Sequence, residues 1–526
     1  MKINNILMTV ASCAALLGCT AKFEEFNTNQ HEATYEQVLP GLAGGLFQQM
    51  ERNVILYRDG TGPLDSDYQI MYNVCAEAWA GYLTPILGNG NHNGSFNIND
   101  GWSRSMWVNK FSYTMNAYNS LQDVVSKDEQ PDIHALADIV KVASMHQVTD
   151  YYGPMPYSQA GKSLTPDYDS QEAIYNQMLS ELDNAIEVLK NFTATKILSD
   201  YDLVYGGDVT KWIKFANSLR LRLAMRVVYA DEALAKEEAE KSLTDPFGLI
   251  DTNADNAVVS GVPHHPIYEI SVNFNDGDTQ MGASMECYLN GYTDPRLPFM
   301  WKTAAKDSKY HGVRLGVHSS NWTNYRNSAG LASAPNAENY DIIWINAAEV
   351  NFLRAEAALR GWNAGGTAQA FYEEGIKQSF EQWGATNLYA HLAKTSQPTT
   401  YTHNLGNNQG SSNVTTRPST IRIPWNTSGT AFEENLERII VQKWIAIYPN
   451  GCEAWAEYRR THYPALLTAT NNDSNGICEN TTSRQIARVP FPISEQAENA
   501  SGLAVGISHL GGPDNAGTRL WWDCKN

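Results

Sequence analysis

The sequence predicts a mainly α-helical protein built from stacked helix pairs. The stretch from Ile343 to Trp362 carries apolar residues at helical spacing along two sides, so it must pack against neighbours on both. A second apolar stripe runs from Thr367 to Trp383, after a turn that contains Gly365 and Gly366. Two helices joined by a short glycine turn are the unit of a helical-repeat scaffold. An ordinary helix pair in a bundle would show the same pattern.

The first of these helices has two further features. Its many small residues allow neighbouring helices to approach closely: Ala347, Ala348, Ala355, Ala357 and Ala358. Glu356 and Arg360 have the i,i+4 spacing of an ion pair, and we expect this pair on the exposed side of the helix.

Composition restricts the class of function. The chain has 526 residues, of which 43% are hydrophobic and 18% charged, as in a folded body with a large core. Its formal net charge is -19, and no basic stripe is present to contact phosphates. We therefore expect no nucleic-acid partner. A negative surface also disfavours adsorption to an anionic membrane.

The N-terminus predicts export and a lipid anchor. Lys2 precedes an apolar run from Ile6 to Gly18, which is too short to span a bilayer and has the layout of a signal peptide at residues 1–18. The run ends in Leu-Leu-Gly-Cys, which resembles a bacterial lipobox with Cys19 as the acylated residue. A general secretory signal with an incidental cysteine is the alternative. Residues 19–33 are polar and acidic, which indicates a tether.

Five cysteines remain after the signal peptide and Cys19: Cys75, Cys287, Cys452, Cys478 and Cys524. Their odd number and long spacings favour neither a disulfide framework nor a zinc site. A bridge between Cys452 and Cys478 in an oxidising envelope stays open.

Residues 34–250 alternate helical stripes with short breaks. We expect six helices, over about Thr34–Ile55, Ile70–Leu83, Trp102–Val125, Ile133–Tyr151, Ile174–Leu189 and Trp212–Val228. A loop rich in Gly and Asn separates the second from the third, between Thr84 and Gly101. The last helix carries Arg220, Arg222 and Arg226, which suits either an anion site or, as we favour, ion pairs with neighbouring helices.

Residues 34–526 are expected to form one domain. The helical scaffold covers about 34–250, 341–384 and 430–465, the last part including a helix over Leu436–Ile447 and a short one with Trp455 and Tyr458. Residues 251–340 read as a loop-rich insertion with some strand, and 385–429 and 466–526 as irregular.

Several long segments, in order, resemble the SusD/RagB family of Bacteroidetes outer-membrane lipoproteins. They are the run Asp150–Tyr157, WIKFANSLRLRLAMRV from Trp212, Asp294-Pro295-Arg296, NFLRAEAALRGW from Asn351, QKWIAIYPNGCEAWAEYRRTHYP from Gln442, and ARVPFPISEQAEN from Ala487. The resemblance extends from Cys19 almost to the C-terminus.

The resemblance implies four tetratricopeptide-like helix pairs with loops and small strands on one side. It implies a lipid-anchored protein at the cell surface, in the outer membrane, that partners a SusC-type TonB-dependent transporter. Such proteins capture nutrient, most often an oligosaccharide, without cleaving it. The RagB branch suggests a peptide as the alternative ligand. The matched motifs are scaffold residues, so they imply fold and partner but no particular ligand.

Loop aromatics next to amides are the candidate ligand contacts, because sugar faces pack on aromatic rings and hydroxyls bond to polar side chains. Family members bind through loops of the N-terminal helix pairs and the insertion. Those loops offer Phe96, Asn97, Asn99, Trp102, Trp322, Asn324, Tyr325 and Arg326. Alternatively, Trp102 begins a helix and Trp322 fills its own loop. Four other tryptophans belong to expected helices and suit packing: Trp212, Trp344, Trp444 and Trp455.

No motif indicates an enzyme, a metal or a cofactor. No pattern nominates the two carboxylates of a glycosidase, and a helical-toroid glycoside hydrolase is the least favoured alternative. Asp65 with Asp67 is spaced like a loop or calcium ligand pair but lacks the closing Glu of an EF-hand. His264 and His265 are adjacent and flanked by prolines, so their side chains diverge.

Overall fold

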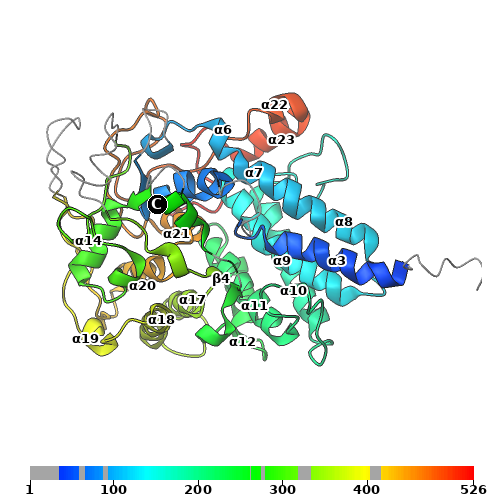
Figure 1. Ribbon diagram of the computed structural model, residues 1–526, viewed down its shortest axis with the longest axis horizontal. Helices are drawn as coiled ribbons and strands as arrows, with labels where there is room; N and C mark the ends of the chain where they lie inside the picture. Colours follow the sequence, from blue (N-terminus) through cyan, green and yellow to red (C-terminus); the bar gives the residue numbers. More distant parts are fainter. Residues whose placement is uncertain are drawn as a thin grey trace, which may run out of the picture.

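The computed structural model describes residues 35–57, 66–86, 93–260, 262, 264–273, 279–317, 333–402 and 416–525. In this part of the chain helices predominate, and strands form only two small sheets (Figure 1). Cys19 and the expected signal peptide and tether lie outside the described residues.

Four helix pairs form the scaffold. They are α3 (Tyr35–Glu51) with α8 (Asn116–Val124), α9 (Pro131–Tyr152) with α10 (Gln171–Leu189), α11 (Val209–Arg226) with α12 (Glu232–Thr244), and α17 (Ala347–Leu359) with α18 (Ala368–Trp383). Each pair packs on the next, because α3 contacts α9, α10 contacts α11 and α11 contacts α17. Figure 1 follows this row from α3 and α8 at one end to α17 and α18 at the other. The prediction of a mainly α-helical repeat scaffold is confirmed.

Side-chain caps fix where several of these helices begin. Ser170, Asp208, Asp231 and Thr367 each accept a hydrogen bond from the backbone N–H three residues further on, at the starts of α10, α11, α12 and α18. The end of α18 is set by Gly384, whose φ of 66° is the left-handed conformation that glycine tolerates best.

Two further helices connect the scaffold to residues 66–79, which we call the N-terminal segment. Helix α20 (Phe432–Ala446) packs on α17 and α18, and α21 (Gly451–Thr461) packs on α5 (Glu77–Trp79) and on α9. Gly451 lies so close to Glu77 that an added Cβ would stand 2.5 Å from the Glu77 backbone nitrogen. The missing side chain at Gly451 therefore allows α21 to approach the backbone of α5 closely.

The segments between α3 and α8 are broken helices. They are α4 (Ser66–Tyr68), η1 (Gln69–Ala76), α5 (Glu77–Trp79), η2 (Asn93–Ser95), α6 (Asp100–Ser103), α7 (Ser105–Asn109) and η3 (Lys110–Met115). The continuous helices expected over 70–83 and 102–125 are therefore interrupted, and the first helix ends at Glu51 instead of Ile55. Cys75, with φ -121° and ψ -110°, marks the kink within η1.

The insertion contributes one strand to each of the two sheets, and the partner strand of each lies outside it. Strand β1 (Leu83–Pro85) pairs antiparallel with β3 (Thr279–Met281), and β2 (Ala257–Val259) with β4 (Ile342–Ile345). The insertion also holds η4 (Asn253–Asp255), α13 (Pro266–Tyr268), η5 (Glu269–Asn273), α14 (Ala283–Tyr292), α15 (Leu297–Met300) and η6 (Ala337–Asn339). Helix α14 was not expected from the sequence.

The helix expected from Ile343 begins later than predicted. Residues Ile342–Ile345 form β4, because this β-branched and aromatic run pairs with β2. Asn346 then begins α17, since its side chain accepts a hydrogen bond of 2.8 Å from the Glu349 N–H. Trp344 is thus a strand residue.

The C-terminal part is less irregular than expected. After the short α19 (Leu388–Leu392) and beyond α21, it contains α22 (Glu495–Glu498) and α23 (Ala500–Leu510). Two contacts of α23 are made at glycines: an added Cβ would stand 2.2 Å from the Pro166 carbonyl oxygen at Gly502 and 2.4 Å from the Tyr168 ring at Gly506.

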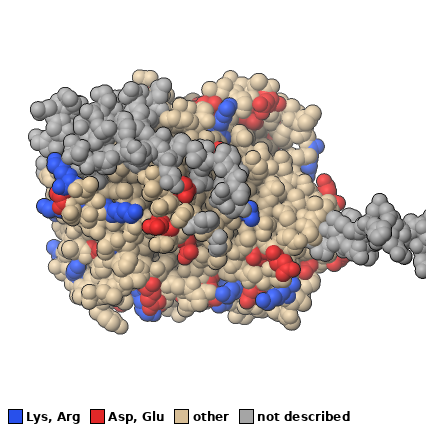
Figure 2. Space-filling view, in the orientation of Figure 1, with Lys and Arg blue, Asp and Glu red and all other residues tan. Residues whose placement is uncertain are grey.

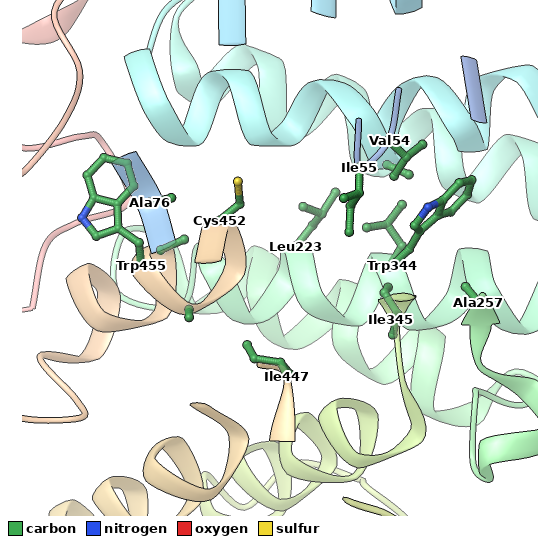
Figure 3. Packing of buried hydrophobic residues seen from close by; sticks show 14 of the residues in the cluster. Val54, Ile55, Ala76, Leu223, Ala257, Trp344, Ile345, Ile447, Cys452 and Trp455 are labelled. Atoms are coloured by element: carbon green, nitrogen blue, oxygen red, sulfur yellow. The ribbon is translucent and has the colours of Figure 1, made fainter. Parts of the chain in front are cut away.

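One large hydrophobic core runs through the scaffold (Figure 3). The four tryptophans expected to pack, Trp212, Trp344, Trp444 and Trp455, are all at most 2% exposed. The described cysteines, Cys75, Cys287, Cys452, Cys478 and Cys524, are free thiols, so the possible bridge between Cys452 and Cys478 is not formed.

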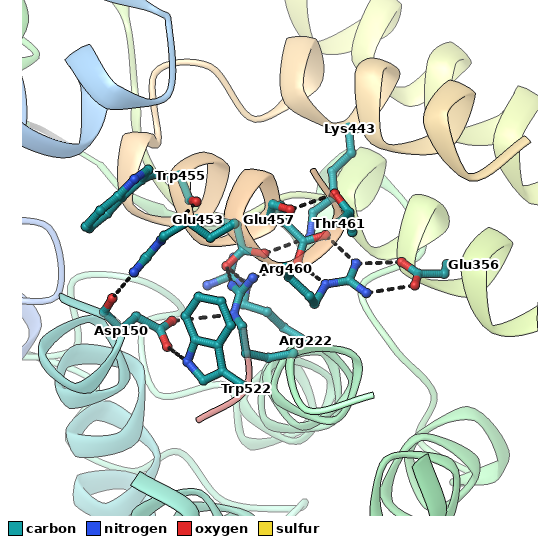
Figure 4. Close-up of polar contacts among 12 residues, drawn as sticks. Asp150, Arg222, Glu356, Lys443, Glu453, Trp455, Glu457, Arg460, Thr461 and Trp522 are labelled. Carbon is teal, nitrogen blue, oxygen red and sulfur yellow. Dashed lines mark hydrogen bonds and ion pairs between the residues drawn. The ribbon is translucent and has the colours of Figure 1, made fainter. Parts of the chain in front are cut away.

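A buried ion-pair cluster joins α11, α17, α20 and α21 (Figure 4). We call the following residues the ion-pair cluster: Arg222, Arg226, Glu349, Glu356, Lys443, Glu453, Glu457 and Arg460. The interpretation of the α11 arginines as ion-paired residues is confirmed, and Arg220 pairs with Asp183 at 2.5 Å. The expected Glu356–Arg360 pair forms at 2.8 Å, but Glu356 is buried and not on an exposed side, because Arg460 also binds it.

Candidate functional site

The described parts of the first loop and of the insertion lie together. Strands β1 and β3 bring them side by side, and the Thr84 hydroxyl donates a 2.8 Å hydrogen bond to the Val313 carbonyl. Further along, an added Cβ on Gly94 would stand 3.0 Å from Leu315 Cδ1. We call the contact of residues 83–86 and 93–102 with residues 279–283 and 313–317 the loop junction.

The predicted residues of the first loop differ in exposure. Phe96 is 2% exposed, with a φ of 66°, so its ring belongs to the core and offers no face to a ligand. Asn97 is exposed, while Asn99 and Trp102 are half-buried, and Trp102 lies in the first turn of α6 against the core. The predicted residues of the insertion, Trp322, Asn324, Tyr325 and Arg326, lie outside the described residues.

A cavity of about 300 Å³ lies between the N-terminal segment, the insertion and the scaffold. Its walls come from α4, η1 and α5, from the residues before and within β4, from α18, and from the turn between α20 and α21. Phe299, Asn339 and Asp341 line its exposed mouth, whereas Gln147 and Trp344 line its buried interior. A cavity of this size is at the small end of the range for ligand sites.

Aromatic side chains make up much of the wall. They are Tyr68, Tyr72, Phe299, Tyr340, Trp344, Trp383 and Tyr448. Tyr340 and Trp383 meet edge to face with ring centroids 5.2 Å apart, which holds both rings in place. Amides stand between the rings, at Asn336, Asn339, Asn346, Gln382 and Asn450.

Four buried polar atoms in the wall have no hydrogen-bond partner in the protein. They are Nε1 of Trp383 on α18, the hydroxyl of Tyr448, Nε1 of Trp344 on β4 and Oε1 of Gln147 on α9, and the last two are the most deeply placed. Trp344 is 2% exposed and Gln147 is 6% exposed. The same two side chains line a smaller hollow of about 10 Å³ behind the cavity, which places them at its inner end. Figure 3 shows Trp344 beside Val54 and Ile55.

The side chains that line the cavity carry little net charge at neutral pH. Burial raises the pKa of Glu77 to about 8, although hydrogen bonds from Tyr68 and Asn73 oppose this shift. Glu77 is therefore mostly protonated at neutral pH. Burial also lowers the pKa of His265 to about 3, so this ring is uncharged. No Lys or Arg is among the described residues that line the cavity.

The second buried carboxylate of the wall is held by the ion-pair cluster. Glu349 accepts two hydrogen bonds from Arg222, of 2.8 and 2.7 Å, and lies 3.5 Å from Lys443 Nζ. Both oxygens of Glu77 are likewise engaged, one by the Tyr68 hydroxyl and one by Asn73 Nδ2 at 3.2 Å. Neither acid has an oxygen directed freely at a substrate, as the two carboxylates of a glycosidase would require.

Sequence reasoning missed the cavity because its residues come from many separate segments. Tyr68 and Trp344 are 276 positions apart in the numbering, and nothing in the local pattern links them. The one local signal is the run Asn336–Asp341, a polar and aromatic stretch directly before a buried strand, which is typical of a loop that lines a site.

The chain belongs to a family of outer-membrane lipoproteins, as the fold and a family comparison show together. The family model described as SusD-like, SusD and RagB outer membrane lipoprotein, matches residues 25–523. The resemblance seen in the sequence is thereby confirmed. A comparison with curated proteins found no match.

Solved structures of the same family superpose closely. A chitin-binding SusD homologue from Flavobacterium johnsoniae is 37% identical, with a TM-score of 0.85 over 92% of this chain and 99% of its own. A SusD homologue from Bacteroides uniformis is also 37% identical, with a TM-score of 0.84 and the same coverage. One from Bacteroides thetaiotaomicron is 34% identical, with a TM-score of 0.82, again over 92% and 99%.

None of the described helices has the length and apolar character needed to span a bilayer. Within the same residues, no group of three or more His, Cys, Asp or Glu side chains is placed to hold a metal ion. On the face that Figure 2 shows, basic and acidic side chains are scattered among uncharged ones.

Proposed function

We propose that this protein is a lipid-anchored glycan-binding protein of the cell surface that captures an oligosaccharide and passes it to a SusC-type TonB-dependent transporter. The observation that carries the proposal is the cavity, whose wall alternates aromatic rings with amides as sugar recognition requires. The chitin-binding homologue, 37% identical over 99% of its length, supports a glycan as ligand. The protein binds its ligand without cleaving it.

Glycan binding is tested by isothermal titration of residues 20–526 with neutral oligosaccharides, chitin fragments among them, and with peptides of similar length. The proposal predicts saturable binding of at least one glycan and none of the peptides. Binding of peptides alone would favour the alternative, an oligopeptide-binding member of the family. Chromatography after long incubation should show no shortened sugar, whereas released product would favour a glycoside hydrolase.

The loop junction forms the outer part of the proposed binding surface. Asn97, Asn99 and Trp102 stand on it, and we assign Trp322, Asn324, Tyr325 and Arg326 to it from the sequence. Trp102→Ala should weaken glycan binding while changing the melting temperature little. A large fall in melting temperature with unchanged binding would show that this ring only packs against the core.

The anchor is tested through Cys19. Cys19→Ala should release the protein into the soluble fraction, because the acyl chains that hold it would be absent. Cys75→Ala, which alters a buried thiol of the folded body, is the control and should leave the protein with the membrane. Membrane fractionation of the Cys19 variant would contradict the anchor. Co-purification of the wild-type protein with a TonB-dependent transporter tests the partner.

A further inference from the structure

The inner end of the cavity offers one donor and one acceptor that the protein does not use. Trp344 Nε1 is a donor only, and Gln147 Oε1 is an acceptor only, while the Gln147 amide nitrogen is already bonded to Val54 O at 2.8 Å and Ala143 O at 3.2 Å. Nearer the mouth, Trp383 Nε1 and the Tyr448 hydroxyl are also unpaired. Buried polar atoms are nearly always paired, so unpaired ones that line the same cavity indicate a group that reaches them from within it.

The side chains that carry these two atoms cannot turn elsewhere. Trp344 is fixed by contacts of its ring with Trp212 and Phe215, at centroid distances of 6.4 and 5.8 Å. Gln147 is fixed by its two backbone partners. The donor and the acceptor are therefore preorganised, which lowers the entropy cost of binding.

The wall selects against charged ligands. An anionic group would meet no Lys or Arg among the described lining residues and would face Asp341 at the mouth. A cationic group would be attracted only by Asp341 at the mouth, because inside the cavity Glu349 is already paired with Arg222 and Lys443 and Glu77 is mostly protonated. The remaining partners are amides, hydroxyls and aromatic faces, which match an uncharged polyhydroxylated ring.

We propose that the cavity binds one uncharged sugar unit at the end of a glycan chain, with a hydroxyl of that unit accepting from Trp344 Nε1 and another donating to Gln147 Oε1. This inference rests on the proposed function and adds to it the chemical class of the ligand and the part of the chain that is recognised. The other sugar units of the glycan chain extend past Phe299 and Trp383 toward the protein surface.

The first test removes the donor. Trp344→Phe keeps an aromatic ring and breaks no hydrogen bond within the protein, but the smaller ring leaves a gap beside Trp212 and Phe215, so we expect a moderate fall in melting temperature with the fold retained. Trp301→Phe is the matched control, because Trp301 is also buried and its Nε1 also lacks a partner, yet it does not line the cavity. Titration with a neutral oligosaccharide should show about tenfold weaker binding for Trp344→Phe and unchanged binding for Trp301→Phe. Equal affinities in both variants would overturn the inference.

The second test uses the wild-type protein, so it does not depend on any variant folding. A neutral oligosaccharide is compared with the same chain oxidised to a carboxylate at its terminal unit, and with the free monosaccharide. We expect the oxidised chain to bind at least tenfold more weakly than the neutral one, and the free sugar to compete for the site at higher concentration. Equal binding of neutral and oxidised chains would refute end recognition.

These outcomes separate the inference from the proposed function. If glycans bind but neither Trp344→Phe nor oxidation weakens them, the protein binds glycans at the loop junction and the cavity assignment is wrong. If no neutral or oxidised glycan binds at all, the proposed function itself fails.

Discussion

The ion-pair cluster and the cavity meet at Glu349 but differ in how their polar groups are satisfied. In the cluster, Arg460 donates to both Glu356 and Glu457 at 2.7 to 2.9 Å, and every carboxylate has a basic partner. In the cavity, Trp344 Nε1 and Gln147 Oε1 have none. Paired buried charges fix how helices are placed, whereas unpaired neutral groups beside open space suit a ligand.

The ion-pair cluster and the cavity also differ in the pKa values of their carboxyl groups. Burial alone would raise the pKa of Glu453, but Arg226, Lys443 and Arg222 outweigh burial and hold this pKa below its usual range. Glu77 has no basic partner, so burial prevails and its pKa rises to about 8. The cluster is thus ionised at neutral pH, and the cavity is close to uncharged.

Disrupting the ion-pair cluster should have the largest effect on the free energy of unfolding. Arg460→Met leaves Glu356 and Glu457 buried with fewer basic partners, so we expect a loss of about 3–5 kcal/mol in the free energy of unfolding, measured by urea denaturation at pH 7. Lys377→Met, which removes an exposed pair with Glu374, is the control and should cost less than about 1 kcal/mol. Similar costs for the two variants would show that the cluster does not hold the scaffold together.

Replacing Glu77 with an uncharged residue should have the next largest effect on the free energy of unfolding. Its pKa is raised in the folded state, so its contribution to stability is complete below the unfolded pKa near 4.5 and is lost as the pH rises through 8. Relative to Glu77→Gln, the wild type should therefore lose on the order of 3 kcal/mol between pH 5 and pH 8. Urea denaturation at both pH values measures this difference. A constant gap between the two proteins would mean that Glu77 is ionised at both.

Removing one aromatic ring at the mouth of the cavity should have the smallest effect, and this effect is on ligand affinity. Phe299 is 41% exposed and lines the mouth, so Phe299→Ala should weaken binding of a neutral oligosaccharide by about 1 kcal/mol, because one stacking face is lost. Tyr389→Ala is the control, since that ring is 85% exposed and lies outside the cavity wall. Calorimetric titration that gives the same affinity for both variants would place the ligand away from this mouth.

The sequence predicted the scaffold because helix pairs leave local signals. These signals lie within a few residues of one another. They are the apolar stripe of each helix, the cap at its start, such as Thr367, and the glycine at its end, such as Gly384. The ion pairs of Arg222 and Arg226 were also predictable in kind, because charged residues interleaved on an otherwise apolar helix need partners.

Strand β4 and the cavity were not predictable for a different reason. Ile342–Ile345 fits a helical stripe as well as a strand, and only pairing with β2, over 80 residues earlier, decides between them. The cavity depends on where Tyr68, Gln147 and Trp344 meet, which no periodicity encodes. The sequence-based ligand residues were chosen as loop aromatics, and Phe96 shows the limit of that rule, since its loop folds the ring into the core.

A crystal structure of the protein soaked with a neutral oligosaccharide that binds in titration tests the account most directly. We predict that the terminal sugar ring lies inside the cavity, with hydroxyl oxygens about 3 Å from Trp344 Nε1 and Gln147 Oε1. An oligosaccharide held only at the loop junction, with no sugar atom inside the cavity, would contradict it.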